Sequence, residues 1–314
     1  MTDQYRWRPL DADSVEAWCA LTNLIAEFDD TEETYTPQDL AEELAESGVD
    51  PARDTLAVWS GDELVGFGQL RVREGLNEGR ASAWIGGGVR PDHRGRGVGT
   101  ELLDRLEPRA RELAAERQAG RPVKLSVGGG LENDPVRPLL VGRGYELVRY
   151  FTLMERPLPA SDLPAPARPV VPYADEWAEP LRLAHNEAFE DHYGSVPNSA
   201  AEWADGLAMR AYRPDLTFLA VSDVGTVLGY TMAYSYLPGE LYVGRVGTVR
   251  AARGQGYAKA CLIAALQAAS AQGFEVAKLD VDSINPTGAG ALYESVGFRA
   301  IKQFGSFAKV VPPL

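Results

Sequence analysis

The chain has 314 residues, 45% of them hydrophobic, which is enough to bury two ordinary domain cores of about 150 residues each. Its formal net charge of −14 argues against a nucleic-acid partner, which would require a basic stripe, and against an anionic membrane surface. Two cysteines, Cys19 and Cys261, and three scattered histidines give no disulfide framework and no metal-ligand spacing, so we expect two core thiols and no metal.

The N-terminus carries no apolar segment of the kind found in a signal peptide, and no apolar run reaches the roughly 18 residues of a membrane-spanning helix. The sequence therefore predicts a cytoplasmic protein without membrane contact. It leaves open whether the protein is a monomer or a homodimer.

Apolar spacing in the first half of the chain predicts a mixed α/β domain. Residues 12–28, for example, space Trp18, Leu21 and Ile25 for one buried helix face. The other expected elements are a strand over 5–10, a helix from about 37, a hairpin over 56–67, a strand over 83–89, a helix from 97, a strand over 123–127, a short helix ending near 142, and a strand over 145–154 that closes the domain.

Five prolines between residues 155 and 169 are too many for a helix or a central strand, and they predict a semi-rigid linker over 156–169. This linker separates an N-terminal domain, 1–155, from a C-terminal domain, 170–314. The pattern then restarts, with expected helices over 177–189 and 201–209, a hairpin over 218–230, a strand over 240–249, a helix from about 255, a strand over 276–281, a short helix within 285–298, and a last pair of strands.

A glycine-rich turn between a strand and a helix occurs once in each half. Gly95 and Gly97 recur as Gly254 and Gly256 at one offset (254 − 95 = 159). Glycine lets successive backbone N–H groups turn toward one anion, and the start of the following helix adds free N–H groups and the positive end of its dipole. Two such turns at a domain-length spacing predict two sites for a pyrophosphate group.

The turns resemble the signature of the GCN5-related N-acetyltransferase (GNAT) superfamily, Arg/Gln-x-x-Gly-x-Gly/Ala at the start of a helix. Residues 94–99 and 253–258 both match it, and residues 285–298 match a second family element, an Asn followed by Leu-Tyr and Gly-Phe. The resemblance implies the α/β (α+β) class, with two tandem GNAT-like domains, each a mixed, mostly antiparallel sheet flanked by helices. It also implies an N-acetyltransferase with acetyl-CoA as the acyl donor.

By the same resemblance, loop amides would hold the pyrophosphate of acetyl-CoA, and a backbone N–H near 246–248 would polarise the thioester carbonyl. The implied cofactor-binding residues of the second domain are Val246, Thr248, Arg253, Gly254, Gln255, Gly256, Tyr257, Ala258 and Asn285. Those of the first domain are Arg94, Gly95, Arg96, Gly97, Val98 and Gly99.

Transfer to an amine needs a base for the amine and an acid near the leaving sulfur. Tyr293 matches the acid of the family. Position 242, where several relatives carry a glutamate, is Tyr, and Glu240 lies on the same face of a regular strand, so Glu240 is the first candidate base. Tyr242, Asp282 or a water molecule remain alternatives.

The first domain lacks both groups, because positions 81 and 83 are Ala and Leu140 stands where the second domain has Tyr293. We expect it to be catalytically degenerate. It would either bind acetyl-CoA or support the structure of the second domain. Turnover is therefore assigned to residues 170–314.

The acceptor is expected over the first two helices of the second domain and the facing strands. We expect a primary amine of a small molecule there, with carboxylates for a second ammonium group and aromatic side chains as walls. The candidate residues are Glu190, Asp191, Tyr193, Trp203 and Tyr234. Two alternatives stay open: a non-catalytic acyl-CoA-binding sensor, and a protein or peptide N-acetyltransferase.

Overall fold

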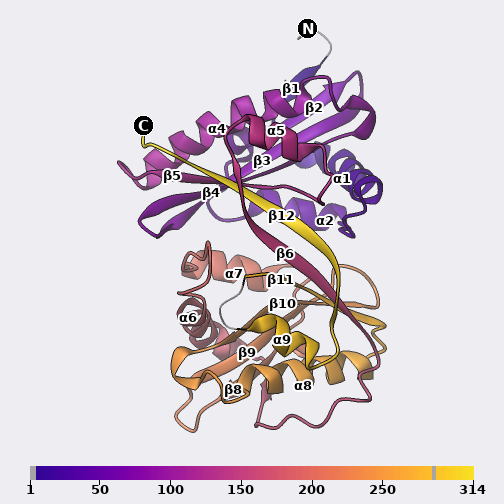
Figure 1. Ribbon diagram of the computed structural model, residues 1–314, viewed down its shortest axis with the longest axis vertical. Coiled ribbons are helices and arrows are strands. Elements are labelled where there is room, and N and C mark those ends of the chain that lie inside the picture. The colour runs from indigo at the N-terminus through magenta and orange to yellow at the C-terminus, as the bar shows by residue number, and fades with distance from the viewer. Residues whose placement is uncertain (1–4, 285–287) are drawn as a thin grey trace. The chain divides into compact units, whose positions relative to one another are not determined.

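The computed structural model describes residues 5–284 and 288–314, which fold into two compact units (Figure 1). Unit 1 comprises Met1–Arg149 and Phe304–Leu314, and unit 2 comprises Tyr150–Gln303. Each unit is a mixed, mostly antiparallel sheet flanked by helices, which confirms the predicted fold class.

Unit 1 contains a sheet with the strand order β1-β2-β3-β4-β5-β12, in which β4 and β5 are parallel and the other neighbours antiparallel. Its strands are β1 (Arg6–Arg8), β2 (Thr55–Ser60), β3 (Glu63–Asn77), β4 (Arg80–Val89), β5 (Val123–Gly128) and the end of β12 (Arg299–Val311). Its helices are α1 (Val15–Asp29), α2 (Pro37–Ala45), α3 (Pro51–Asp54), α4 (Val98–Arg117) and α5 (Val136–Gly142).

Two apolar layers cover the faces of this sheet. Helices α1 and α2 pack on one face, where Trp18 and Leu40 meet Phe67 of β3. Helices α4 and α5 pack on the other face, where Leu106 and Leu140 join a core with strand residues. Alternation along the strands therefore assigns side chains to either an α1/α2 face or an α4/α5 face.

Unit 2 repeats this plan with the strand order β6-β11-β10-β9-β8-β7, in which β10 and β11 are parallel and the other neighbours antiparallel. Its strands are β6 (Glu146–Pro157), β7 (Val171–Pro172), β8 (Phe218–Val221), β9 (Val227–Tyr234), β10 (Glu240–Thr248) and β11 (Val276–Asp282). Its helices are α6 (Ala178–Ala188), α7 (Ala200–Ala208), α8 (Tyr257–Ala271) and α9 (Ala289–Glu294).

The last strand of each unit differs from the sequence-based expectation. Residues 151–157 of β6, expected to close the first domain, pair with β11 in unit 2. Residues 306–311 of β12 pair with β5 in unit 1. The expected last pair of strands is also wrong, because residues 299–311 form a single strand. The two units have thus exchanged their closing strands.

Local sequence explains where the helices begin. In α2, Thr36 accepts a hydrogen bond from the backbone N–H of Asp39, and Pro37 occupies the first turn, where its missing N–H costs nothing. Helix α8 begins at Tyr257, two residues after the expected start, because Gly256 adopts a left-handed conformation with φ 82° and acts as the N-cap.

Cys19 and Cys261 are both buried free thiols, as predicted. Within the parts of the chain that the structure describes, no helix is both long and apolar enough to cross a bilayer. In the same residues, no cluster of potential metal ligands is present.

Candidate active site

The glycine turn of unit 2 has the geometry of an anion-binding loop. Gly254 and Gly256 have φ values of 77° and 82°, and open space lies where a side chain on either glycine would project. The first backbone N–H groups of α8 have no partner within the helix, and they face outward together with the positive end of its dipole. The loop therefore fits a phosphate group.

The turn of unit 1 has the same geometry. Gly95 and Gly97 have φ values of 72° and 87°, again with open space beyond each glycine, and α4 begins directly after at Val98. Arg96 is exposed and makes no ion pair with any residue that the structure describes. This loop therefore offers a free cationic side chain beside its backbone N–H groups.

The signature arginines have a structural task besides any contact with a cofactor. Arg94 donates to both carboxylate oxygens of Asp29, at 2.7 and 2.6 Å, and to the Val89 carbonyl at 3.0 Å. Arg253 donates to the Ala188 carbonyl at 3.1 Å. Each arginine thus ties the end of the first helix of its unit to the glycine loop.

Sequence reasoning missed a cation at the second loop. Arg168, at the end of the proline-rich segment, donates from Nε to the Gln255 carbonyl at 3.0 Å, and its guanidinium lies 5.3 Å from the centre of the Tyr257 ring. The segment reaches this point along α8, where Gln267 donates to the Pro164 carbonyl at 3.0 Å. The sequence feature that could have indicated this cation is the arginine near the end of the proline-rich segment.

The central parallel strands of each unit separate beside the glycine loop. In unit 2, the pairing of β10 with β11 ends at Tyr242 and Lys278, although both strands continue. The Val249 N–H bonds to Leu228 of β9, so by alternation the N–H groups of Val246 and Thr248 point away from β9, toward the gap. Those two groups are the predicted donors to a thioester carbonyl.

Tyr293 lies in α9 and is 8% exposed, with its ring 6.1 Å from that of Phe298. Burial raises the pKa of its phenol to about 12. The hydroxyl makes no hydrogen bond with another described residue. Tyr293 is therefore a neutral phenol at physiological pH, with a proton available for donation. Asn285, expected to orient the same turn, lies outside the described residues.

The candidate base, Glu240, lies in an ion pair. Its Oε2 is 2.8 Å from Nζ of Lys278, and the two side chains are 14% and 13% exposed. The bulge of β10 falls between Val243 and Arg245, so Glu240 and Tyr242 share a face as expected, and the Tyr242 hydroxyl donates to Asp280 at 2.9 Å.

Asp282, an alternative base, accepts the Ile284 N–H at 2.9 Å and is buried. Its carboxylate therefore holds the turn after β11.

The expected acceptor residues do not form one group. Glu190 and Asp191 pair with Arg250, at 3.2 and 2.9 Å, beside the glycine loop. Trp203 is buried in α7, and the guanidinium of Arg245 lies 5.0 Å from the centre of its ring. Arg245 makes no ion pair with a described carboxylate, so this part of the unit 2 face is cationic.

Two further acceptor candidates are aromatic. Tyr234 is buried between Tyr212 and Tyr236, with ring centres at 5.6 and 6.3 Å. Tyr193 is half-buried in the segment before α7. Tyr234 therefore belongs to the same buried cluster as Trp203.

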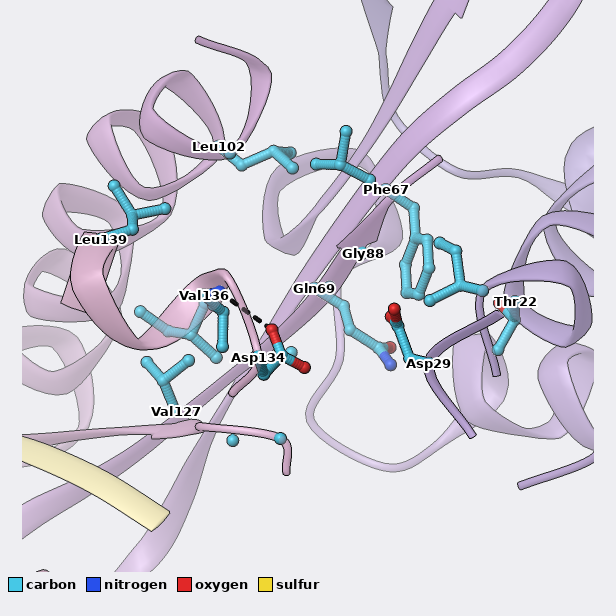
Figure 2. Close-up of a pocket in the computed structure, with 18 of the residues that line it drawn as sticks. Thr22, Asp29, Phe67, Gln69, Gly88, Leu102, Val127, Asp134, Val136 and Leu139 are labelled. Carbon is cyan, nitrogen blue, oxygen red and sulfur yellow. Dashed lines mark hydrogen bonds between the residues drawn. The ribbon is translucent and has the colours of Figure 1, made fainter. Parts of the chain in front are cut away.

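Unit 1 contains a cavity of about 860 Å³ that includes its glycine loop. The lining continues from Gly95 and Gly97 past the three glycines at 86–88 of β4 to α1 and α2. Figure 2 shows Asp29 and Asp134 directed into this space from α1 and from the segment before α5. Burial raises the pKa of the Asp134 carboxyl, although the Val136 N–H donates to it at 2.9 Å. The unit expected to be degenerate thus contains a substantial cavity.

Two acyl-CoA-type anion loops on mixed sheets with separated central strands define an acetyltransferase of the GNAT type. The chain matches the acetyltransferase (GNAT) family over residues 18–123 and again over 177–298, and it belongs to this family. It is therefore an N-acetyltransferase with two tandem GNAT domains.

Two curated relatives are named mycothiol acetyltransferase. The protein from Streptomyces avermitilis is 32% identical over 254 residues, which cover 77% of this chain and 75% of the relative. The protein from Streptomyces coelicolor is 32% identical over 263 residues, which cover 79% of this chain and 78% of the relative. The similarity thus extends over most of both chains.

Two solved structures share the fold over nearly their whole length. A GCN5-related N-acetyltransferase from Sphaerobacter thermophilus has a TM-score of 0.77 at 23% identity, covering 100% of this chain and 98% of its own. A tandem GNAT protein from the clavulanic acid biosynthesis pathway has a TM-score of 0.70 at 22% identity, covering 99% of each chain. At this identity the likeness concerns the fold alone.

Proposed function

We propose that unit 2 transfers an acetyl group from acetyl-CoA to a primary amine of a small molecule by direct attack of the amine. The observation that carries the proposal is Tyr293, a buried neutral phenol without a described partner, in the same unit as the anion loop of Gly254 and Gly256. The mycothiol acetyltransferase relatives support a small-molecule acceptor.

The residues of unit 2 suit acetyl-CoA, which supplies an acetyl group activated as a thioester. The loop N–H groups would hold the pyrophosphate, and Arg168 would add a positive charge beside it. The N–H groups of Val246 and Thr248 would donate to the thioester carbonyl oxygen as negative charge develops there. Unit 1 has an equivalent loop, so it would also bind an acyl-CoA.

Tyr293 would give its proton to the departing sulfur. A phenol with a pKa of about 12 is protonated at neutral pH, and it is a weak enough acid to stay so until negative charge builds up next to it. Leu140, at the matching place in unit 1, is fully buried and has no proton to give. This difference favours turnover in unit 2.

Glu240 would remove a proton from the attacking amine through a water molecule. Its Oε2 faces Lys278, so Oε1 is the oxygen with which it would bind that water. Glu240 and Tyr293 approach from opposite faces of β10, because Leu241 and Val243 pack with Tyr293 while Glu240 alternates to the other side. A proton would thus enter and leave the reacting centre on different sides of the sheet.

The acceptor of unit 2 would carry a polar or anionic group as well as its amine. Arg245 projects over Trp203 without a described carboxylate partner, whereas Glu190 and Asp191 are engaged by Arg250. A guanidinium over an aromatic ring is suited to a carboxylate or to several hydroxyl groups. A polycationic acceptor is disfavoured there.

The direct test is release of free thiol from acetyl-CoA against a panel of amines. The panel pairs each simple amine with an analogue that carries a carboxylate or hydroxyl groups, and it includes a cysteinyl amino-sugar and short peptides. A selective small-molecule hit supports the proposal. Activity on peptides alone would indicate a protein acetyltransferase, and acetyl-CoA binding without any turnover would indicate a sensor.

A further inference from the structure

The helix that carries the proposed acid is too short to hold its own position. Helix α9 has six residues, and an isolated helix of that length is not stable in water. Two backbone hydrogen bonds close the turn after it, because the Tyr293 carbonyl accepts the N–H groups of Val296 and Phe298, each at 3.1 Å. The place of the Tyr293 side chain therefore depends on what holds this turn.

Arg156, near the end of β6, holds the turn through its guanidinium. Nη1 donates to the Val296 carbonyl, and Nη2 donates to the carboxylate of Asp162. A positive charge at this place is favoured, because the carbonyl end of a helix is the negative end of its dipole. Gly297 has a φ of 91°, and a side chain there would overlap the Arg156 guanidinium. The arginine and the turn are therefore closely packed.

Stability alone does not account for an arginine at position 156. Arg156 is 4% exposed, and the Val296 that it contacts is 1% exposed. Burying a guanidinium is costly, and well-packed apolar side chains often stabilise such a place as well as an ion pair does. Asp162, the counter-charge, is 69% exposed, so the ion pair compensates little of that cost. What the arginine adds is a directed contact to the turn.

The proline-rich segment that supplies Asp162 is itself fixed along α8. The Ala160 N–H donates to the Ser270 hydroxyl at 2.9 Å. Gln267 donates to the Pro164 carbonyl at 3.0 Å, so α8 holds the segment on both sides of Asp162. The carboxylate is therefore anchored to the same helix that begins at the glycine loop.

Unit 1 has a comparable contact without an acid. The Gly-Tyr pair that follows α5 matches the Gly-Phe pair that follows α9, so the Arg143 carbonyl matches that of Val296. Lys309 of β12 donates to the Arg143 carbonyl at 3.2 Å and to Glu107 at 2.7 Å. The helix held there carries Leu140 where unit 2 has the acid. The unit 1 contact therefore shows what such a cation does for the fold alone.

We propose that Arg156 is a positioning residue for Tyr293, with Asp162 as its anchor. By fixing the Val296 carbonyl, Arg156 would hold α9 so that the phenol stays within reach of the departing sulfur. The inference rests on the function proposed for unit 2 and deepens it, because it assigns two further residues to the acid step. Arg156 acts through the turn after α9, and the proline-rich segment is thereby part of the catalytic unit.

The test compares thiol release from acetyl-CoA by Arg156→Met in the wild-type background and in the Tyr293→Phe background. If Arg156 acts through the phenol, its loss should lower kcat about tenfold or more in the wild-type background, and less than about twofold where the phenol is already absent. The dissociation constant of acetyl-CoA should stay unchanged. A merely structural arginine would lower kcat by the same factor in both backgrounds.

Two milder variants keep the test valid if Arg156→Met folds poorly. Asp162→Asn changes only an exposed carboxylate, and it should lower kcat a few-fold, again only where Tyr293 is present. Arg156→Lys keeps a donor for the Val296 carbonyl, so it should recover part of the turnover. Lys309→Met is the matched control, and it should lower the melting temperature while kcat stays unchanged.

Hydrogen exchange gives a readout that needs no turnover, because Arg156→Met should raise exchange in peptides that cover 289–298. Three results would overturn the inference and leave the proposed function intact: equal losses of kcat in both backgrounds, unchanged exchange in those peptides, or a loss of kcat in Lys309→Met as large as in Arg156→Met. Full turnover by Tyr293→Phe would overturn the inference and the proposed function together.

Discussion

Lys278 Nζ lies 2.8 Å from Glu240 Oε2, and the two side chains are almost equally buried on neighbouring strands β11 and β10. If the ion pair were purely structural, removing either partner would lower the stability and the turnover of the protein by similar amounts. A catalytic carboxylate positioned by the ammonium would make the two losses unequal. The pair therefore gives a direct way to judge the proposed base.

Glu240→Gln should lower kcat by about 10²- to 10⁴-fold, the usual contribution of a general base. Lys278→Met should keep most of the turnover, because it leaves the carboxylate in place. It should lower the melting temperature by about as much as Glu240→Gln does, because either change breaks the ion pair. The measurement is steady-state kinetics with thermal melts of both variants. Equal losses of turnover in the two variants would reduce Glu240 to a structural role.

Gly256→Asp should abolish acetyl-CoA binding to unit 2, because it places a carboxylate against the pyrophosphate site. Gly256→Asn is the matched control, since it imposes a similar side chain on the same positive φ of 82° without charge. Calorimetric titration with acetyl-CoA, compared between the single variant and the double variant Gly97→Asp, Gly256→Asp, distinguishes binding at the two loops. An unchanged affinity in that double variant would show that neither loop holds the cofactor.

Arg168→Ala should raise the KM for acetyl-CoA with little change in kcat, because Arg168 contacts the glycine loop at the Gln255 carbonyl. The loss of one exposed phosphate contact predicts an effect of a few-fold, falling as salt increases. Arg299→Ala, a change at an exposed arginine of unit 2, is the control. If the two variants behave alike, the arginine merely anchors the proline-rich segment.

Phe307→Ala should destabilise unit 1 by about 3–5 kcal/mol, although residue 307 follows all of unit 2 in the sequence. Phe307 is 3% exposed and belongs to the core formed by α4, α5 and β5. Hydrogen exchange should rise in peptides from 81–127. Ile301→Ala, at a 38% exposed position of the same strand, should have little effect. A response confined to peptides from 150–303 would contradict the strand exchange.

The sequence predicted the parts of this protein that depend on local chemistry. Gly95, Gly97, Gly254 and Gly256 adopt the positive φ values that their turns require, and Tyr293 is buried in a short helix before a glycine cap. The tandem arrangement predicted from the repeat is confirmed by the two family matches, over residues 18–123 and 177–298. Backbone turns and helix starts are short-range features, so a single sequence can specify them.

Long-range partners could not be predicted in the same way. The strands over 146–157 and 299–311 have similar patterns, and alternation does not say which sheet accepts each strand. The carboxylates of Glu190 and Asp191 looked available because Arg250 lies about 60 residues further along the chain. The cavity of unit 1 is lined by residues of α1, α2, β3, β4 and α4, which lie far apart in the sequence, so it could not be predicted from local patterns.

The most direct measurement compares thiol release from acetyl-CoA by the wild type and by Tyr293→Phe, with the amine that the panel selects. We predict that kcat falls by about 10²- to 10⁴-fold in the variant, while the dissociation constant of acetyl-CoA stays unchanged. The wild-type rate should show no alkaline loss from Tyr293 until the pH approaches about 12. Turnover by Tyr293→Phe at the wild-type rate would contradict the assignment of the acid, and with it the assignment of catalysis to unit 2.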